Sequence, residues 1–229
     1  RDWSVTGVQT CALPICTYPN WLANEAARGN EFNNAPTLGI TPEHETILPF
    51  TRLIGGPMDY TPGLFHFKLN QYDSERKTKV RTTLAKQLAL YVTMYSPLQM
   101  AGDLPENYNV YPDAFQFIVD VPVDWDDTKI LEAEPGDYIT IARMQKGKRN
   151  WFVGSITDEN ARISNIKLDF LDKDKEYLAT IYKDAPNADW DNQPEAYVIE
   201  KKKVTNKSEL KIEMAKGGGY ALSIILNEK

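Results

Sequence analysis

The second half of this 229-residue chain alternates between apolar and polar residues with a period of two. The clearest segments carry apolar side chains at every second position, namely Ile166, Leu168 and Phe170; Leu210, Ile212 and Met214; and Tyr220, Leu222, Ile224 and Leu226. Because successive side chains of a strand point to opposite faces, this pattern predicts half-buried strands. Turn signals separate the segments, including Pro135-Gly136, Lys146-Gly147-Lys148 and Asp158-Glu159-Asn160. We therefore expect an antiparallel β-sandwich.

The first half has a different pattern, which predicts strands and helices in alternation. The apolar run Thr46 to Phe50 indicates a buried strand that opens into the Gly/Pro-rich loop 55–63. Apolar residues then recur at every fourth position from Val80 to Val92, as in an amphipathic helix, and a second helical pattern runs from Asp113 to Val121. This order suits the end of a parallel α/β structure, and it predicts a domain boundary near residue 124.

The first sixteen residues differ in origin from the rest. The segment VTGVQTCALPI, from Val5 to Ile15, is the translation of a common sequencing-adapter oligonucleotide. We therefore interpret residues 1–16 as an artefactual leader and exclude them from fold reasoning. Both cysteines, Cys11 and Cys16, lie in this leader and are not interpreted as a metal site or disulfide.

Charge and hydropathy restrict the classes of partner. A formal net charge of −6 and a pI near 5.1, without a long basic stripe, argue against a nucleic-acid surface. A neutral or sugar-like partner fits this balance better. No run approaches the roughly 18 apolar residues that a membrane-spanning helix needs, and the N-terminus lacks the apolar region of a signal peptide.

Carboxylates are the main candidates for chemistry, because the sequence has no His/Cys cluster, nucleophile elbow or phosphate-binding loop. Glu25 and Glu31 lie in TYPNWLANEAARGNEFN at 17–33, where a predicted short helix and Gly29 separate them. This spacing allows both carboxylates to converge on one pocket, where such groups bind a hard cation or perform acid chemistry. The spacing alone leaves open that both are solvated loop residues.

Other polar residues give weaker indications. Gly217 to Gly219 predict a turn rather than a phosphate site, because no Lys-Ser/Thr pair follows. His44 and His66 lack a third ligand at motif spacing, and Asp59 can simply brace its own loop. For these three residues the sequence leaves open both an ordinary loop position and a functional one.

Four long stretches carry a resemblance to a known family: TYPNWLANEAARGNEF at 17–32, LPFTRLIGGPMDYTPG at 48–63, QLALYVTMYSPLQMAGDLPENY at 87–108 and LEAEPGDYITIAR at 131–143. They resemble the C-terminal third of family 97 glycoside hydrolases. The resemblance implies the C-terminal part of a catalytic (β/α)₈ barrel at 17–123, followed by an antiparallel β-sandwich at 124–229. The last barrel strands are then expected near 46–54 and 97–102.

The resemblance also implies a function for the parent enzyme, which is similar to a calcium-dependent inverting α-glucosidase acting on starch-derived oligosaccharides. Glu31 in ARGNEF resembles the general acid, and Glu25 in NEAARG resembles a Ca²⁺ ligand, with Glu31 also near the ion. An inverting enzyme needs a second carboxylate across a gap of roughly 6.5–9.5 Å. That base belongs upstream, so we expect this chain to be inactive alone.

Two alternatives remain open at this point. One is the retaining α-galactosidase branch of the same family. The other is a non-catalytic sandwich that binds carbohydrate or forms oligomers. The expected partner is an α-linked oligosaccharide, with a homo-oligomer formed through the C-terminal domain, and the expected location, by resemblance, is the periplasm.

Overall fold

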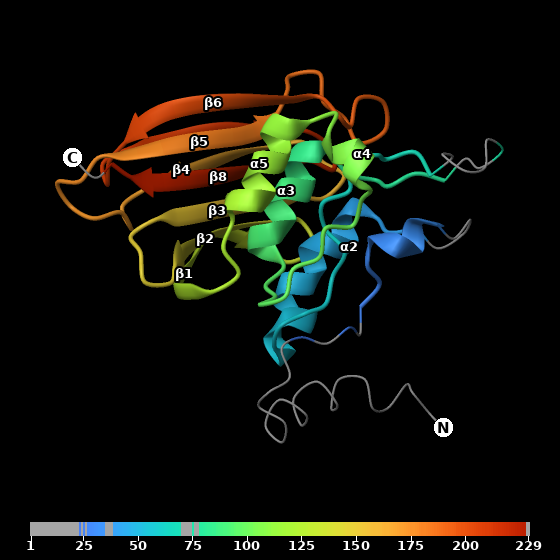
Figure 1. Cartoon of the computed structure of the whole chain (residues 1–229), viewed down its shortest axis with the longest axis horizontal. Helices are drawn as coiled ribbons and strands as arrows, with labels where there is room; N and C mark the ends of the chain where they lie inside the picture. The colour runs from blue at the N-terminus through green and yellow to red at the C-terminus, as the bar shows by residue number, and fades with distance from the viewer. Residues whose placement is uncertain are drawn as a thin grey trace.

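Eight β-strands form the C-terminal half of the described part of the chain (Figure 1). The computed structural model describes residues 23, 25, 27–34, 39–69, 75 and 78–227. The leader at 1–16, with Cys11 and Cys16, lies outside these residues. The strands are β1 (Trp125–Glu134), β2 (Tyr138–Gln145), β3 (Trp151–Thr157), β4 (Arg162–Lys167), β5 (Tyr177–Asp184), β6 (Tyr197–Val204), β7 (Glu209–Met214) and β8 (Gly219–Leu226).

The strands pair into two sheets, and every pairing is antiparallel. Six strands form one sheet in the order β1-β2-β3-β8-β5-β6, and β4 pairs with β7 in a second, two-stranded sheet. The predicted turns all lie between strands, and Gly136 and Gly147 supply the left-handed backbone there, with φ of 86° and 68°. Gly217 has a φ of 62° and also lies in a turn. The expected antiparallel sandwich is confirmed.

The six-stranded sheet is covered on both faces. One face packs on the β4–β7 sheet through a core that includes Val153, Tyr177 and Leu222. The other face packs on helices through a core that includes Phe152, Ile156 and Ala221. All of β3 is buried, because it lies in the middle of these three layers. Its sequence therefore lacks the alternation that marks β7 and β8.

The remaining elements are short helices that precede the sandwich. They are η1 (Asn30–Asn34), α2 (Pro42–Ile47), η2 (Leu48–Phe50), η3 (Arg52–Gly55), α3 (Leu84–Thr93), α4 (Pro105–Tyr108) and α5 (Pro112–Asp120). The two predicted helices correspond to α3 and α5. Thr83 caps α3, and its side chain accepts a hydrogen bond from the Lys86 backbone N–H, so Val80 lies before the helix.

Helix α3 crosses the six-stranded sheet over β3 and β8 (Figure 1). All ten of its residues are buried. Gly154 of β3 permits the close approach, because a Cβ atom at this position would lie 2.5 Å from the Ala89 carbonyl oxygen. Residues on both sides of position 124 therefore share one core, and the boundary predicted there stays a prediction.

The predicted strand at 46–54 is wrong, because α2, η2 and η3 occupy this segment. Thr41 accepts a hydrogen bond from the His44 backbone N–H, Pro42 occupies the first turn, and acidic residues follow, which together begin a helix. These local signals outweigh the apolar run that follows them.

The predicted strand at 97–102 is also wrong. Gln99 folds back and donates through Nε2 to the carbonyl oxygens of Tyr91 and Met94, which satisfies the C-terminal end of α3. Among the described residues before position 124 the structure has no named strand, but isolated bridge residues occur, as in the pair Lys68–Lys79. The barrel sheet expected from the fold class is therefore not part of the described chain.

Candidate functional site

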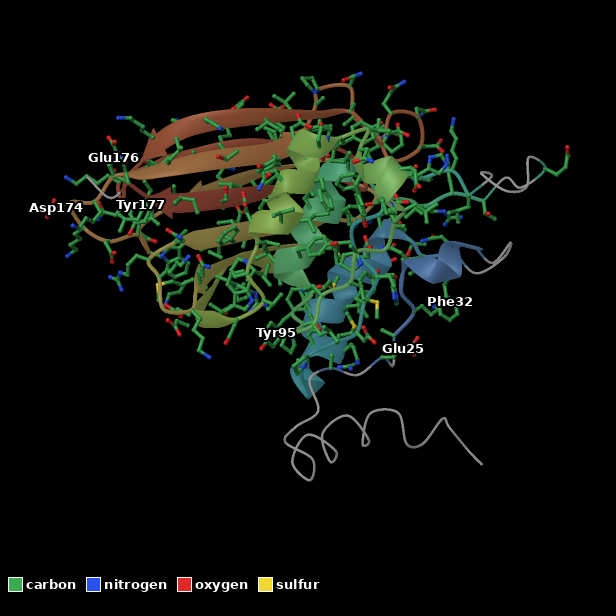
Figure 2. The ribbon with its side chains drawn as sticks, viewed as in Figure 1. Glu25, Phe32, Tyr95, Asp174, Glu176 and Tyr177 are labelled. Atoms are coloured by element: carbon green, nitrogen blue, oxygen red, sulfur yellow. The ribbon has the colours of Figure 1, made fainter. Side chains whose placement is uncertain are left out.

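The segment that carries Glu25 and Glu31 lies at the end of the molecule away from the β4–β5 loop. Figure 2 shows Glu25 and Phe32 at the opposite end from Asp174, Glu176 and Tyr177. Glu25 is exposed, and Glu31 belongs to η1. The Glu31 side chain lies outside the described residues, so the convergence of the two carboxylates stays a prediction.

Asn30 attaches η1 to the loop that follows η3. Its backbone N–H donates to Thr61 Oγ1 over 2.9 Å, and its side-chain Nδ2 donates to the Thr61 carbonyl oxygen, also over 2.9 Å. Only 2% of Asn30 is exposed to solvent. Two hydrogen bonds between one pair of residues fix the orientation of the turn as well as its distance from the loop.

Asn33 holds the other end of the same turn. Its Nδ2 donates to the Asn30 carbonyl oxygen over 3.0 Å, and its Oδ1 accepts a hydrogen bond from the Ile40 backbone N–H over 2.9 Å. Like Asn30, it is 2% exposed. The backbone of Glu31 is therefore flanked by two buried asparagines that are both tied to distant backbone.

Gln87 of α3 binds the backbone of the loop that follows η3. Its Oε1 accepts from the backbone N–H groups of Gly63 and Leu64, over 2.9 and 3.1 Å, and lies 3.5 Å from Asn30 Nδ2. Its Nε2 donates to Thr82 Oγ1 over 3.1 Å. Gln87 is fully buried, and all of these bonds except the partly buried one from Leu64 are made away from water.

Arg52 makes an equivalent attachment for Glu25. Its Nε and Nη2 donate to the Glu25 carbonyl oxygen over 3.1 and 2.8 Å. Its Nη1 donates to the Gly56 carbonyl oxygen over 3.3 Å. The guanidinium therefore joins the backbone beside Glu25 to the loop after η3, while the Glu25 side chain remains exposed.

Two tyrosines and an aspartate complete the attachment of the loop. Asp103 Oδ2 accepts from the backbone N–H groups of Phe65 and His66, over 2.6 and 2.7 Å. Tyr108 donates to the Gly63 carbonyl oxygen over 2.9 Å, and Tyr91 donates to the Met100 carbonyl oxygen over 2.8 Å. Burial raises the pKa of the Tyr108 hydroxyl to about 12 and also raises the pKa of the Tyr91 hydroxyl, so both remain donors across the physiological range.

The two histidines have different surroundings. His44 Nε2 lies 3.1 Å from the Arg28 carbonyl oxygen, on the segment between Glu25 and Glu31. His66 Nε2 is buried, and no hydrogen-bond partner for it lies among the described residues. Asp59 is half-buried beside the same loop. Of the three residues, only His44 contacts the segment between Glu25 and Glu31, and the structure assigns a role to none of them.

The described residues do not by themselves make a metal centre. Across the described ranges, no three residues of the types His, Cys, Asp and Glu lie close enough together to hold a metal ion. Glu25 offers one exposed carboxylate, whose oxygen atoms are the donor type that Ca²⁺ prefers. A single carboxylate is part of a donor set, and the other ligands have to come from elsewhere in the protein.

The asparagine and glutamine attachments were not found from the sequence. Amide side chains have no spacing motif, and their partners lie 31 positions away for Asn30 with Thr61 and 24 positions away for Gln87 with Gly63. One signal was present, since Lys86 and Gln87 interrupt the otherwise apolar stretch LAKQLALYV at 84–92. A polar residue inside a fully buried helix requires a hydrogen-bond partner.

None of the helices described in the structure is long and apolar enough to cross a membrane.

Comparison with known proteins gives a consistent set of relatives. Residues 124–225 match the family model described as glycosyl-hydrolase 97 C-terminal, oligomerisation. A retaining α-galactosidase of Bacteroides thetaiotaomicron is 38% identical over 212 residues, which is 91% of this chain and 31% of that protein. A probable retaining α-galactosidase of Streptomyces bingchenggensis is 32% identical over 152 residues, or 66% of this chain and 22% of that protein.

The solved structures include a family 97 enzyme of Pseudoalteromonas sp. strain K8, determined in complex with panose and with acarbose. It is 47% identical, with a TM-score of 0.88, and the match covers 94% of this chain and 33% of that one. The chain thus spans about a third of the length of the Bacteroides and Pseudoalteromonas relatives.

Proposed function

We propose, because this chain belongs to glycoside hydrolase family 97, that it is the C-terminal third of an enzyme that hydrolyses α-glucosidic bonds in starch-derived oligosaccharides. The observation that carries the choice of substrate is the 47% identity, over 94% of the chain, to an enzyme crystallised with panose and acarbose. Panose is a trisaccharide of α-linked glucose. The resemblance to family 97 seen in the sequence is confirmed, and inversion at the anomeric carbon is part of the proposal.

The retaining α-galactosidase branch is the second candidate. It is favoured by the Bacteroides relative, which is 38% identical over 91% of this chain. The residue that distinguishes the two branches is a nucleophilic aspartate in one and a distant glutamate base in the other, and we place it in the part of the protein before this chain.

Residues 17–123 are proposed to belong to the C-terminal part of the catalytic barrel in the whole enzyme. The support is the extent of the structural match, which covers 94% of this chain and therefore extends well before residue 124. Large apolar side chains remain exposed in this part of the chain, with Ile54 at 78% and Leu98 at 60%. Such surface is expected where the rest of a barrel packs.

Within the proposed site, Glu31 is the general acid that protonates the glycosidic oxygen, and Glu25 is a Ca²⁺ ligand, with Glu31 also near the ion. A bound Ca²⁺ would supply positive charge that orients a water molecule and a sugar hydroxyl. This chain's contribution is to present both glutamates from a segment that Arg52, Asn30 and Asn33 attach to buried loops. The base lies outside this chain, so the chain alone is proposed to be inactive.

The C-terminal domain is proposed to form a homo-oligomer in the periplasm, and the name of its family model supports the oligomer. Both edges of the six-stranded sheet are protected against edge-to-edge pairing. Strand β6 presents exposed lysines at 201–203, and β1 carries two register shifts along its pairing with β2. The proposed contact is therefore a face of the domain rather than a sheet edge.

The test uses the whole enzyme that contains this chain, with residues numbered as here. We expect kcat/KM on an aryl α-glucoside to exceed that on the matching α-galactoside, and proton NMR to show the β-anomer as the first product. Preference for the galactoside with an α-anomer as first product would move the enzyme to the second candidate. Absence of turnover on both substrates, in a protein that folds and binds Ca²⁺, would contradict both.

The roles of the two glutamates are tested in the same enzyme. Glu31→Gln should lose most activity on substrates with poor leaving groups and keep far more on activated aryl or fluoride glycosides, which need little protonation. Glu25→Gln should weaken Ca²⁺ affinity, so that added Ca²⁺ restores part of the activity. Wild-type kinetics for both variants would identify them as solvated loop residues.

A further inference from the structure

The turn that carries Glu31 is attached to α3 by a buried chain of hydrogen bonds. We propose that Asn30, with its partners Thr61 and Gln87, is a positioning residue that fixes the backbone of η1 and thereby places the Glu31 carboxyl for proton transfer. This inference rests on the proposed function, in which Glu31 is the general acid. Asn30 itself touches neither the substrate nor the reacting atoms in this proposal.

The chain of contacts starts at α3, whose residues are all buried. The helix packs across β3 and β8. Gln87 extends from this helix and holds the backbone of Gly63 and Leu64, and Asn30 then binds Thr61 of the same loop. The position of η1 is thus set by the sandwich through one helix and one loop.

The geometry of the Asn30 contact restricts rotation as well as translation. Backbone N–H and side-chain Nδ2 of Asn30 both donate to Thr61, each over 2.9 Å, and they meet different oxygen atoms of that residue. Asn33, three residues further on, is fixed separately through Ile40. Glu31 follows Asn30 directly, so its Cα atom is held by contacts that do not involve its own side chain.

Placement of this kind matters more for an acid than for a group that only binds. A general acid has to bring its oxygen to roughly 2.6–3.2 Å from the atom it protonates. A displacement of about 1 Å in a catalytic group costs on the order of 100-fold in rate. Loss of the Asn30 contact should therefore reduce kcat where protonation limits the reaction and leave KM nearly unchanged.

The experiment uses the whole enzyme and compares Thr61→Val with Thr61→Ser. Valine matches the shape of threonine but removes the Oγ1 acceptor of the Asn30 N–H, whereas serine keeps it. With Thr61→Val we expect kcat on a poor-leaving-group glycoside to fall about tenfold, with less than about a threefold loss on an activated aryl glycoside. Thr61→Ser should resemble the wild type on both substrates.

A further pair of variants separates positioning from general damage to the loop. Asn30→Ala should show the same leaving-group dependence as Thr61→Val, with a larger effect. Tyr108→Phe removes the donor to the Gly63 carbonyl oxygen, so it loosens the same loop without touching η1. At matched loss of thermal stability, Tyr108→Phe should reduce kcat on both substrates by the same factor.

The variants distinguish the positioning role of Asn30 from the general-acid role of Glu31 on which it depends. If Glu31→Gln is selective for poor leaving groups but Thr61→Val and Asn30→Ala are not, the positioning role is wrong and the acid assignment stands. If Tyr108→Phe reproduces the selectivity of Thr61→Val, the effect belongs to the loop as a whole and the role of Asn30 is likewise wrong. If Glu31→Gln itself shows no selectivity, the proposed acid fails, and the inference fails with it.

Discussion

The sandwich and the region before it satisfy their backbone polar groups in different ways. In the sandwich, β3 pairs with β2 and β8 along nearly its whole length, so most of its N–H and C=O groups meet other backbone groups. In the loop 61–66, four successive backbone N–H groups, from Gly63 to His66, are accepted by only two side chains, Gln87 and Asp103.

This difference determines what a single substitution can do. A substitution on an exposed face of β4 or β7 removes no ladder bond, because the ladder is made by the main chain. A substitution at Gln87 removes the acceptor of two buried N–H groups at once. Buried groups without partners are costly, so the first region should be far more sensitive to single polar substitutions than the second.

The strongest test of this contrast is Lys86, which joins the two regions. It is fully buried, its Nζ lies 3.0 Å from Glu45 Oε2, and it donates to the carbonyl oxygens of Pro42 and Thr157. Lys86→Met leaves the Glu45 carboxylate buried without its cation, so we expect a loss of about 3–5 kcal/mol in the free energy of unfolding. Urea denaturation of the purified 229-residue chain, followed by circular dichroism, measures this loss.

Two controls accompany this measurement. Lys167 pairs with Glu209 over 3.6 Å on the outer face of the β4–β7 sheet, where both side chains are 71% exposed, so Lys167→Met should leave stability almost unchanged. Adding Glu45→Gln to Lys86→Met removes the unpaired charge and should recover part of the loss. Equal effects of Lys86→Met and Lys167→Met would contradict the contrast between the regions.

A second test concerns Asp184, at the junction between α3 and the sandwich. Burial raises the pKa of this carboxyl to about 6, although the Thr83 hydroxyl and the backbone N–H groups of Ala215 and Gly219 donate to it and oppose the rise. The folded state therefore holds the proton more tightly than the unfolded chain. The resulting stabilisation is complete below a pH of about 4 and is lost as the pH rises through about 6.

Asp184→Asn isolates this contribution, because asparagine keeps the shape and can still accept from both backbone N–H groups. Between pH 4 and pH 7 the free energy of unfolding of the wild-type chain should fall by about 2 kcal/mol relative to that of the variant. Urea titrations of both proteins at several pH values give this difference. Parallel pH profiles for the two proteins would show that Asp184 ionises freely in the folded state.

The same contrast explains which parts of the fold followed from the sequence. Strand β7 was predicted because its apolar residues alternate with exposed polar ones, so that one face is buried and the other is open. Strand β8 was predicted from the same spacing of large apolar residues, although both of its faces are largely buried. The first segment was placed less well, because β4 ends at Lys167 and leaves Leu168 and Phe170 beyond the strand. Strand β3 does not show this alternation of apolar and polar residues, because both of its faces are covered.

The candidate site was predicted to a smaller extent. Glu25 and Glu31 stood out only through resemblance to a family, since two glutamates six positions apart are common on loops. The contacts that hold their segment involve Asn30, Gln87 and Arg52, whose partners are distant in the chain. Local patterns describe which face of an element is buried, and they contain no information on which distant loop a buried amide will bind.

The smallest expected effect concerns the helix found where a strand was predicted. Thr41 Oγ1 accepts a hydrogen bond from the His44 N–H over 3.3 Å, and α2 has only six residues, so this cap serves a large part of its first turn. Thr41→Ala should lower the free energy of unfolding by about 1 kcal/mol, whereas Thr41→Ser, which keeps the hydroxyl, should change it little. Urea denaturation of the three proteins resolves this difference.

If this segment were instead a strand whose pairing depends on the apolar run 46–50, the hydroxyl at position 41 would have no N–H to accept from, and alanine and serine would be equivalent. A difference in stability between Thr41→Ala and Thr41→Ser therefore supports the helix. Equal stability of the two variants would favour the strand instead.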